Sequence, residues 1–349
     1  MVKNTTIKAV DLFCGAGGLT HGLIQAGIDV VAGYDIEESC RFAFEHNNKA
    51  EFINRDVTEL TKEEILAHLE GADYSLLAGC APCQPFSTYS RAKKKSSGKD
   101  DRWNLLNSFG RLVSTVKPDF VTMENVPGLA DQAVFNDFIT LLTASGYHYD
   151  YKIVFCPDYG MAQTRRRLVL IASQLGPIRL PTPTHKPEEY TTVLDVIGHL
   201  PIIAAGETHK DDPLHKASSL SPINMLRIRA SVPGGSWLDW PKDLRASCHK
   251  KESGKTYPSV YGRMRWDEPA PTITTQCNGF GNGRFGHPDQ DRAISLREAA
   301  MLQSFPADYG FLPSDRKHDI SPLAKMIGNA VPVRLGEIVG LCFRNSLAD

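Results

Sequence analysis

Three reactive residue types each follow an apolar, strand-like stretch of this 349-residue chain. Cys83 lies in Ala-Pro-Cys-Gln-Pro (81–85) behind the apolar stretch 73–79, and Pro82 ends any strand ladder because it lacks an N–H. A thiol at a strand tip in an α/β protein is a candidate nucleophile. Glu124 follows the stretch 119–123, and arginines 165–167 follow another such run.

The cysteine and the glutamate each admit other interpretations. Cys80 and Cys83 form a C-x-x-C pair, which suggests thioredoxin-like redox chemistry or half of a zinc site. A zinc site needs four ligands, and no second C-x-x-C or matching histidine pair follows. Glu124 at a strand end could be a general acid if burial raises its pKa, or one partner of a structural salt bridge.

A glycine-rich segment stands at the junction of the first strand and the first helix. Gly15, Gly17 and Gly18 permit a tight turn with close backbone approach to a ligand, but their spacing matches neither G-x-G-x-x-G nor a P-loop. The segment is therefore either a nucleotide-like cofactor site or a structural turn. Asp35, after the second strand, could accept hydrogen bonds from ribose hydroxyls, and Asp56 from an adenine amine. Both could equally be ordinary surface aspartates.

Strand and helix patterns alternate through the first half of the chain, which predicts a doubly wound, mostly parallel α/β sheet. Periodicity predicts strands over 7–13, 29–33, 74–78, 120–123, 153–155 and 168–172, and helices over 19–26, 37–46 and 105–116.

The pattern changes after residue 173. A proline-rich connector at 176–184 leads into an irregular region to about 290, and helical periodicity returns at 296–303 and 325–339. We therefore expect a catalytic and cofactor-binding domain at 1–185 plus 318–349. A smaller, irregular domain is expected at 186–317.

The composition limits the cellular compartment and the classes of partner more than it limits the function. The formal net charge is −1, so only local basic clusters, at 91–99, 165–167 and 249–255, could indicate a nucleic-acid partner; each could also be a solvated surface. The eight cysteines show no disulfide spacing, and no apolar run approaches the ~20 residues that span a bilayer. We expect a cytoplasmic protein with no membrane partner and no metal.

Taken together and in order, these segments resemble the DNA cytosine-5 methyltransferase family. The resemblance covers nearly the whole chain except about 180–260. It rests on the glycine segment 11–18, Pro-Cys-Gln at 82–84, Glu-Asn-Val at 124–126, Gln-Thr-Arg-Arg-Arg at 163–167, Arg-Glu-Ala-Ala at 297–300 with Gln-Ser-Phe-Pro at 303–306, and Gly-Asn-Ala-Val-Pro at 328–332.

The resemblance implies a chemical role for each candidate residue. Cys83, as a thiolate, would add to carbon 6 of cytosine and make carbon 5 nucleophilic. Glu124 would protonate or hydrogen-bond the adjacent ring nitrogen, Arg167 would hold the ring carbonyl, and Arg165 would orient the site. The methyl donor would be S-adenosylmethionine, and the residues implied to bind it are Phe13, Gly15, Gly17, Gly18, Asp35, Ile36, Asp56, Val57, Pro82, Leu105, Asn329 and Val331.

The implied partner is double-stranded DNA, from which the target base must be flipped out. Ser87, Lys93, Lys94 and Lys95 lie in a polar stretch (87–101) that resembles a loop closing over DNA, and Arg263 and Arg265 are candidate contacts in the irregular domain. The resemblance also implies that 186–317 is a target-recognition domain with a hinge. We expect a nucleoid-associated monomer of bacterial or phage modification type, with a companion restriction endonuclease as a functional, not a physical, partner.

The chain departs from the family pattern at Cys80, where members usually carry glycine. Two hypotheses explain this residue: it fills space, or it forms a regulatory disulfide with Cys83 under oxidation. Two other functions remain open: an RNA cytosine-5 methyltransferase, although the Cys-Phe-Thr tripeptide of that branch is absent, and a catalytically inactive homologue, although Pro-Cys and Glu-Asn-Val are both present.

Overall fold

The computed structural model describes residues 5–82, 104–250, 258–313 and 319–348. The chain divides into two compact units, which are described separately. The first unit comprises Met1–Phe155, Arg166–Pro183 and Val331–Asp349, and the second comprises Cys156–Arg165 and Thr184–Ala330.

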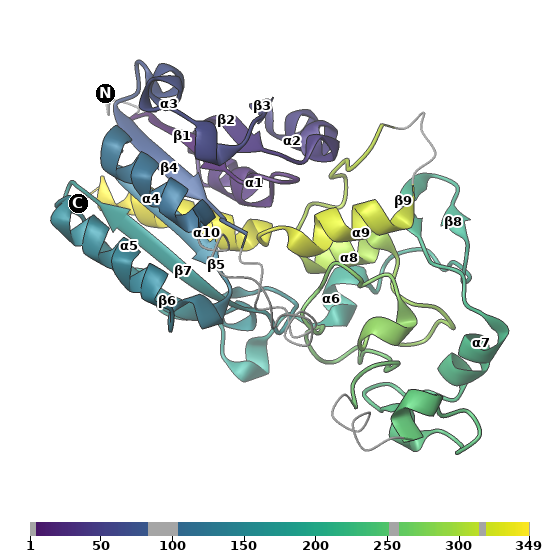
Figure 1. Ribbon diagram of the computed structural model, residues 1–349. Coiled ribbons are helices and arrows are strands. Elements are labelled where there is room, and N and C mark those ends of the chain that lie inside the picture. Colours follow the sequence, from purple (N-terminus) through teal and green to yellow (C-terminus); the bar gives the residue numbers. More distant parts are fainter. Residues whose placement is uncertain (1–4, 83–103, 251–257, 314–318, 349) are drawn as a thin grey trace. The chain divides into compact units, whose positions relative to one another are not determined.

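The first unit is built on a seven-stranded sheet in the order β3-β2-β1-β4-β5-β7-β6 (Figure 1). Its strands are β1 (Ile7–Leu12), β2 (Asp29–Asp35), β3 (Glu51–Asn54), β4 (Tyr74–Gly79), β5 (Phe120–Asn125), β6 (His148–Phe155) and β7 (Arg166–Ser173). The first five strands pair in parallel, whereas β7 runs antiparallel to β5 and β6 antiparallel to β7. This confirms the predicted doubly wound, mostly parallel sheet.

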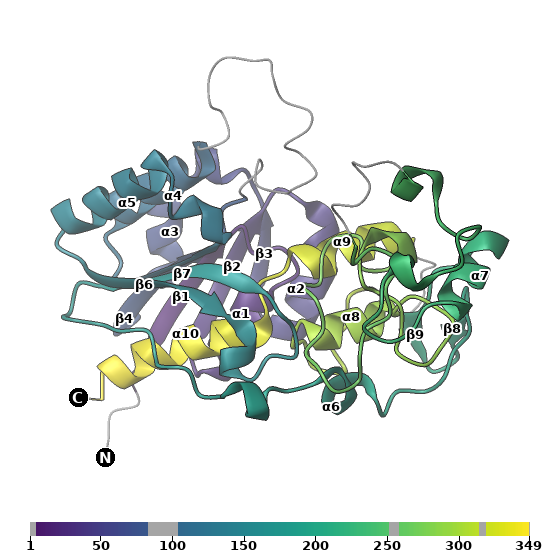
Figure 2. The same cartoon turned by 90° about the horizontal axis from the view of Figure 1, so that it is seen from below.

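Helices cover both faces of this sheet (Figure 2). One face carries α3 (Lys62–Leu69), α4 (Asn104–Val116) and α5 (Ala133–Ala144). The other face carries α1 (Gly18–Gln25) and α10 (Val333–Ser346). Helix α2 (Arg41–Asn48) packs beside β3. Because the central strands are covered on both faces, they are continuous apolar runs rather than alternating ones. All six residues of β5 are buried.

The helices α1 and α10 approach each other through glycines. A Cβ on Gly22 would overlap the α10 backbone at Val333, and one on Gly336 would lie 2.7 Å from the carbonyl oxygen of Leu19. This contact ties the C-terminal helix to the helix that follows the glycine-rich turn.

The second unit is less regular. It contains α6 (Val193–Ile197), the short hairpin β8 (Thr208–His209) and β9 (Asp212–Lys216), α7 (Pro222–Arg229), α8 (Leu296–Leu302) and α9 (Ile320–Asn329). Trp237, Trp240 and Phe280 form a small aromatic core. The buried Arg292 guanidinium binds both oxygens of Glu298 at 2.7 Å, so each charge is compensated.

Two boundaries differ from those that the sequence suggests. Residues 156–165 and helix α9 belong to the second unit, because their contacts are made there. The helical stretch predicted at 325–339 is two helices, since Pro332 has no N–H to continue α9. Within the described residues, 320–346 is long and apolar enough to cross a membrane, but 67% of its most apolar window is buried, as in a core helix.

Candidate active site

The side chains predicted to do chemistry in the first unit gather at the carboxyl edge of its sheet. The antiparallel strand β7 begins where β5 ends, with Asn125 opposite Leu168. Its first residues therefore lie beside the last residues of a parallel strand. This edge carries Asp11, Asp35, Cys80, Glu124 and Arg167.

Glu124 is held between two neighbours in the sheet. Its side chain is only 7% exposed, and its Oε1 lies 2.7 Å from Nε of Arg167. Its Oε2 accepts a hydrogen bond from the Cys80 thiol at 2.9 Å. The buried carboxylate therefore has a cation on one oxygen and a neutral donor on the other.

Cys80 is suited to donate rather than to react. Desolvation and the nearby Glu124 carboxylate raise the pKa of the Cys80 thiol well above its usual value. A thiol that stays protonated is a poor nucleophile and a poor metal ligand. Among the described residues, no group of three or more His, Cys, Asp or Glu side chains could hold a metal ion.

The backbone leading toward Cys83 is fixed by Asn125, a residue to which the sequence analysis gave no role. The buried Asn125 amide donates to the carbonyl oxygen of Ala81 at 2.9 Å, and its own oxygen accepts from Val126 N–H. The motif Glu-Asn-Val thus supplies both the acidic group and the anchor for the segment before Pro82. Cys83 itself lies outside the described residues.

The glycine segment forms a turn of left-handed residues. Phe13, Gly15 and Gly17 have φ values of 61°, 50° and 85°, and Gly17 is the N-cap of α1. A left-handed phenylalanine is sterically costly, so the surrounding turn must hold it in place. The Gly15 N–H donates to Asp35 at 2.8 Å, which links the ends of β1 and β2.

Asp11, the first residue of the glycine segment, has a role that the sequence did not indicate. It is 1% exposed; its Oδ2 accepts from the Thr20 hydroxyl at 2.6 Å, while its Oδ1 has no hydrogen-bond partner. Burial raises the pKa of Asp11 to about 7, and the charge of Asp35 adds to this. A buried acceptor without a hydrogen-bond partner is rare in folded proteins and calls for an explanation.

The other residues implied to bind a cofactor vary in exposure. Asp35 is partly buried, which raises its pKa, and it also accepts from Glu37 N–H at 2.8 Å. Ile36 is 73% exposed, whereas Val57 and Val331 are buried. Asp56 caps a short turn through Thr58 N–H. Pro82 is exposed and Leu105 partly buried.

Two residues predicted for catalysis or cofactor binding belong to the second unit. Arg165 is 2% exposed there, and its guanidinium donates to the carbonyl oxygens of Ile273 at 2.8 Å and Gly328 at 3.3 Å. These bonds join segments that are distant in sequence, so Arg165 organises its own unit. Asn329 is exposed at the end of α9.

The expected DNA contacts need one correction. Arg263 is not a surface residue: it is 5% exposed, and its guanidinium donates to four backbone carbonyls and to Asp291. Its donors hold the second unit together instead of facing solvent. Arg265 is exposed but paired with Asp267 at 2.8 Å. Ser87, Lys93, Lys94 and Lys95 lie outside the described residues.

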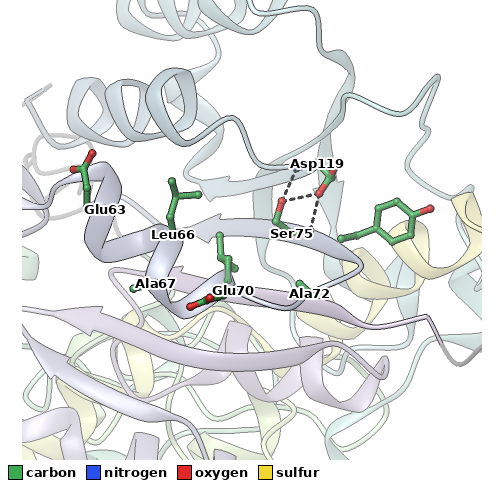
Figure 3. Close-up of a pocket in the computed structure, with 9 residues that line it drawn as sticks. Glu63, Leu66, Ala67, Glu70, Ala72, Ser75 and Asp119 are labelled. Atoms are coloured by element: carbon green, nitrogen blue, oxygen red, sulfur yellow. Dashed lines mark hydrogen bonds between the residues drawn. The ribbon is translucent and has the colours of Figure 1, made fainter.

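A hollow of about 540 Å³ opens at the opposite end of the sheet (Figure 3). It is lined by α3 and the start of β4, and its polar groups bind one another, because Asp119 accepts from both the N–H and the hydroxyl of Ser75. It contains none of the predicted site residues. Ligands of open α/β sheets bind at the carboxyl ends of the strands, so we assign this hollow no role.

The sheet order, the glycine turn and the acidic and basic side chains at one edge define a methyltransferase-type α/β enzyme. Residues 7–342 match the family model for C-5 cytosine-specific DNA methylases, and the chain belongs to this family. It is a DNA cytosine-5 methyltransferase.

Individual relatives agree with this assignment. The chain is 51% identical over 341 residues to the Type II methylase M.HgiDII of Herpetosiphon aurantiacus, covering 97% of this chain and 95% of that protein. It is 32% identical to the Type II methyltransferase M1.BsuMI of Bacillus subtilis, covering 96% and 80%. A candidate DNA modification methyltransferase encoded within an E. coli prophage has the same fold, with a TM-score of 0.73, 23% identity and coverage of 99% and 100%.

Proposed function

We propose that the protein transfers a methyl group from S-adenosylmethionine to carbon 5 of a flipped-out cytosine in a specific double-stranded DNA sequence, through a covalent adduct with Cys83. The observation that carries the proposal is the buried Glu124–Arg167 pair, placed at the sheet edge beside the segment that leads to Cys83. The pair places an acidic group and a cation close enough together to contact a single cytosine ring.

Cys83 would activate the carbon that receives the methyl group. Carbon 5 of cytosine is a poor nucleophile, and addition of the Cys83 thiolate to carbon 6 moves electron density onto it. Methyl transfer leaves S-adenosylhomocysteine. Loss of the carbon-5 proton to solvent then lets the ring expel the thiolate and recover its aromaticity. The Cys83 thiolate is thereby regenerated for the next cycle.

Glu124 and Arg167 would stabilise the charge that this addition creates. Glu124 would donate a proton or hydrogen bond to the ring nitrogen between the carbonyl and the amine-bearing carbon, and Arg167 would hold the carbonyl oxygen. Their present ion pair keeps both groups oriented before the base arrives. Arg165, with its donors on backbone carbonyls, would act only as a support.

The turn at the end of β1 fits the methyl donor. S-adenosylmethionine supplies a methyl group on a cationic sulfonium, and its amino-acid portion carries an ammonium. The unpartnered Oδ1 of Asp11 suits a cation, and a Cβ on Gly15 would meet only open space, so the turn leaves room for a ligand. Asp35 and the exposed Ile36 would serve the ribose and adenine.

The setting follows from the relatives' names. Both relatives named above are Type II enzymes, so we infer a modification enzyme of a restriction–modification system, with a companion endonuclease as a functional partner. We propose that residues 186–317 read the target sequence and that the enzyme acts as a cytoplasmic monomer.

The experiment that tests this proposal is Cys83→Ser. Without a thiolate the adduct cannot form, so methyl transfer to unmethylated DNA should fall at least a thousandfold. Binding of DNA and S-adenosylmethionine should stay within about threefold, because the shape of the site is kept. Methylated cytosines are mapped by sequencing, and binding is measured by calorimetry.

A matched variant guards against a general effect of losing a cysteine. Cys248 is exposed, and Cys248→Ser should methylate as the wild type does. Full transfer by Cys83→Ser would remove the proposed mechanism. Methylation of tRNA with none in DNA would instead support an RNA enzyme.

A further inference from the structure

We propose that Cys80 is a positioning residue: its thiol holds one oxygen of Glu124 while the Arg167 guanidinium holds the other. The inference deepens the proposed function and rests on the catalytic role given to Glu124 there. It assigns Cys80 a task other than space filling or disulfide formation.

The sheet places the three residues for this task. Glu124 lies in β5, Cys80 directly follows β4, and Arg167 lies in β7, the strands on either side of β5. The thiol is 2.9 Å from Oε2 and the guanidinium 2.7 Å from Oε1. The terminal torsion of a glutamate is broad when unrestrained. A hydrogen bond at Oε2 and an ion pair at Oε1, which lacks hydrogen-bond geometry, together restrict the plane of the carboxylate, and the thiol is the directional partner of the two.

A thiol suits this position because it donates without introducing a second charge or nucleophile. Burial and the Glu124 carboxylate keep the Cys80 thiol protonated, since both raise its pKa. The donor therefore persists across the pH range in which the enzyme works. Glycine, the residue that the family resemblance leads one to expect here, has no side chain to donate.

The first test compares Cys80→Ala with Cys80→Ser in methyl transfer to unmethylated genomic DNA. Loss of one hydrogen bond to a charged group should lower kcat of Cys80→Ala about tenfold. KM for DNA and for S-adenosylmethionine should change less than twofold, because neither ligand is held by Cys80. Cys80→Ser keeps a donor and should recover most of kcat.

Cys342→Ala is the matched control, because it also removes a partly buried thiol that donates to an oxygen, here the Ile338 carbonyl within α10. It should leave kcat unchanged. Equal kcat for Cys80→Ala and the wild type, or a Cys80→Ser variant as slow as Cys80→Ala, would overturn the inference.

A second test observes the contact without any activity. The infrared S–H band of Cys80, isolated as the difference between wild type and Cys80→Ala, should move to higher frequency in Glu124→Ala, because donation weakens the S–H bond. An unmoved band refutes the contact. If the band shifts in Glu124→Ala but Glu124→Gln methylates normally, the contact is supported and the proposed catalytic role of Glu124 fails instead.

Discussion

Asp11 and Glu124 are two buried carboxyl groups at the same sheet edge, with different partners. Glu124 faces a guanidinium at 2.7 Å, whereas Asp11 accepts hydrogen bonds from the hydroxyl and the backbone of Thr20 and lies close enough to Asp35 to be affected by its charge. A carboxylate without a cation bears the full cost of desolvation. The pKa of Asp11 is therefore raised to about 7.

This carboxyl group should make cofactor binding depend on pH. Below pH 7 Asp11 is mostly protonated and neutral; above it, the carboxylate forms and attracts a cation. The fraction ionised rises about tenfold between pH 6 and 8, so affinity for S-adenosylmethionine should rise by nearly that factor. Calorimetry at several pH values, in buffers of different ionisation enthalpy, should also detect proton release on binding.

Asp11→Asn is the control for this dependence. It keeps the shape and the Thr20 contact but cannot ionise, so its affinity should be low and nearly constant from pH 6 to 8. The same pH dependence in Asp11→Asn would assign the titration to another group. A wild-type affinity that falls as pH rises would contradict the role of Asp11.

At the scale of elements, the contact between α1 and α10 sets the position of the glycine turn. Gly22→Ala should lower the free energy of unfolding by about 1–3 kcal/mol, because its Cβ would overlap the α10 backbone, which cannot move away as a side chain could. Chemical denaturation measures this loss. Cofactor affinity should fall as well, since α1 begins at the turn.

Gly110→Ala, in the middle of α4, is the matched helix variant. A Cβ there would make ordinary contacts, the nearest at 3.4 Å from Phe138, so the variant should be neutral or slightly more stable. Equal destabilisation by both substitutions would mean that helix propensity, and not the close approach, governs Gly22.

Much of the sheet could be predicted from the sequence because its signals are local. Apolar runs predicted β1, β4 and β5, and the rule that parallel strands end at one edge predicted that residues after different strands share a site. The rule does not account for Arg167, which meets Glu124 because the antiparallel strand β7 starts at the edge where the parallel strands end.

The remaining features depend on partners far away in the chain. Nothing near Arg263 indicates that carbonyls of Ile228 and His287 will surround its guanidinium, so an arginine that looks like a surface contact is a structural one. Arg165 differs from Arg167 for the same reason, because its acceptors lie more than 100 residues later. The Cys80–Glu124 contact likewise depends on the pairing of β4 with β5.

At the scale of the whole molecule, a net charge of −1 must be reconciled with a polyanionic substrate. Binding to DNA depends on local cations, because each phosphate neutralised releases condensed counterions. Several arginines in the described residues are already committed to carbonyls or carboxylates, as Arg263 and Arg265 are. The lysines at 93–95 are then the strongest candidates for phosphate contacts.

Replacing Lys93, Lys94 and Lys95 together by alanine should weaken DNA binding and flatten its salt dependence. If all three meet phosphates, the slope of log K against log salt should become less steep by about 2.7 units. Fluorescence anisotropy from 50 to 300 mM salt measures this slope.

Two variants serve as controls for the triple alanine variant. Replacing the three lysines by arginine keeps the charges and should keep the slope. Arg265→Ala removes a cation already paired with Asp267 and should change the slope by less than one unit. A triple alanine variant with the wild-type slope would show that these lysines do not face the DNA, and that phosphate contacts arise elsewhere in the chain.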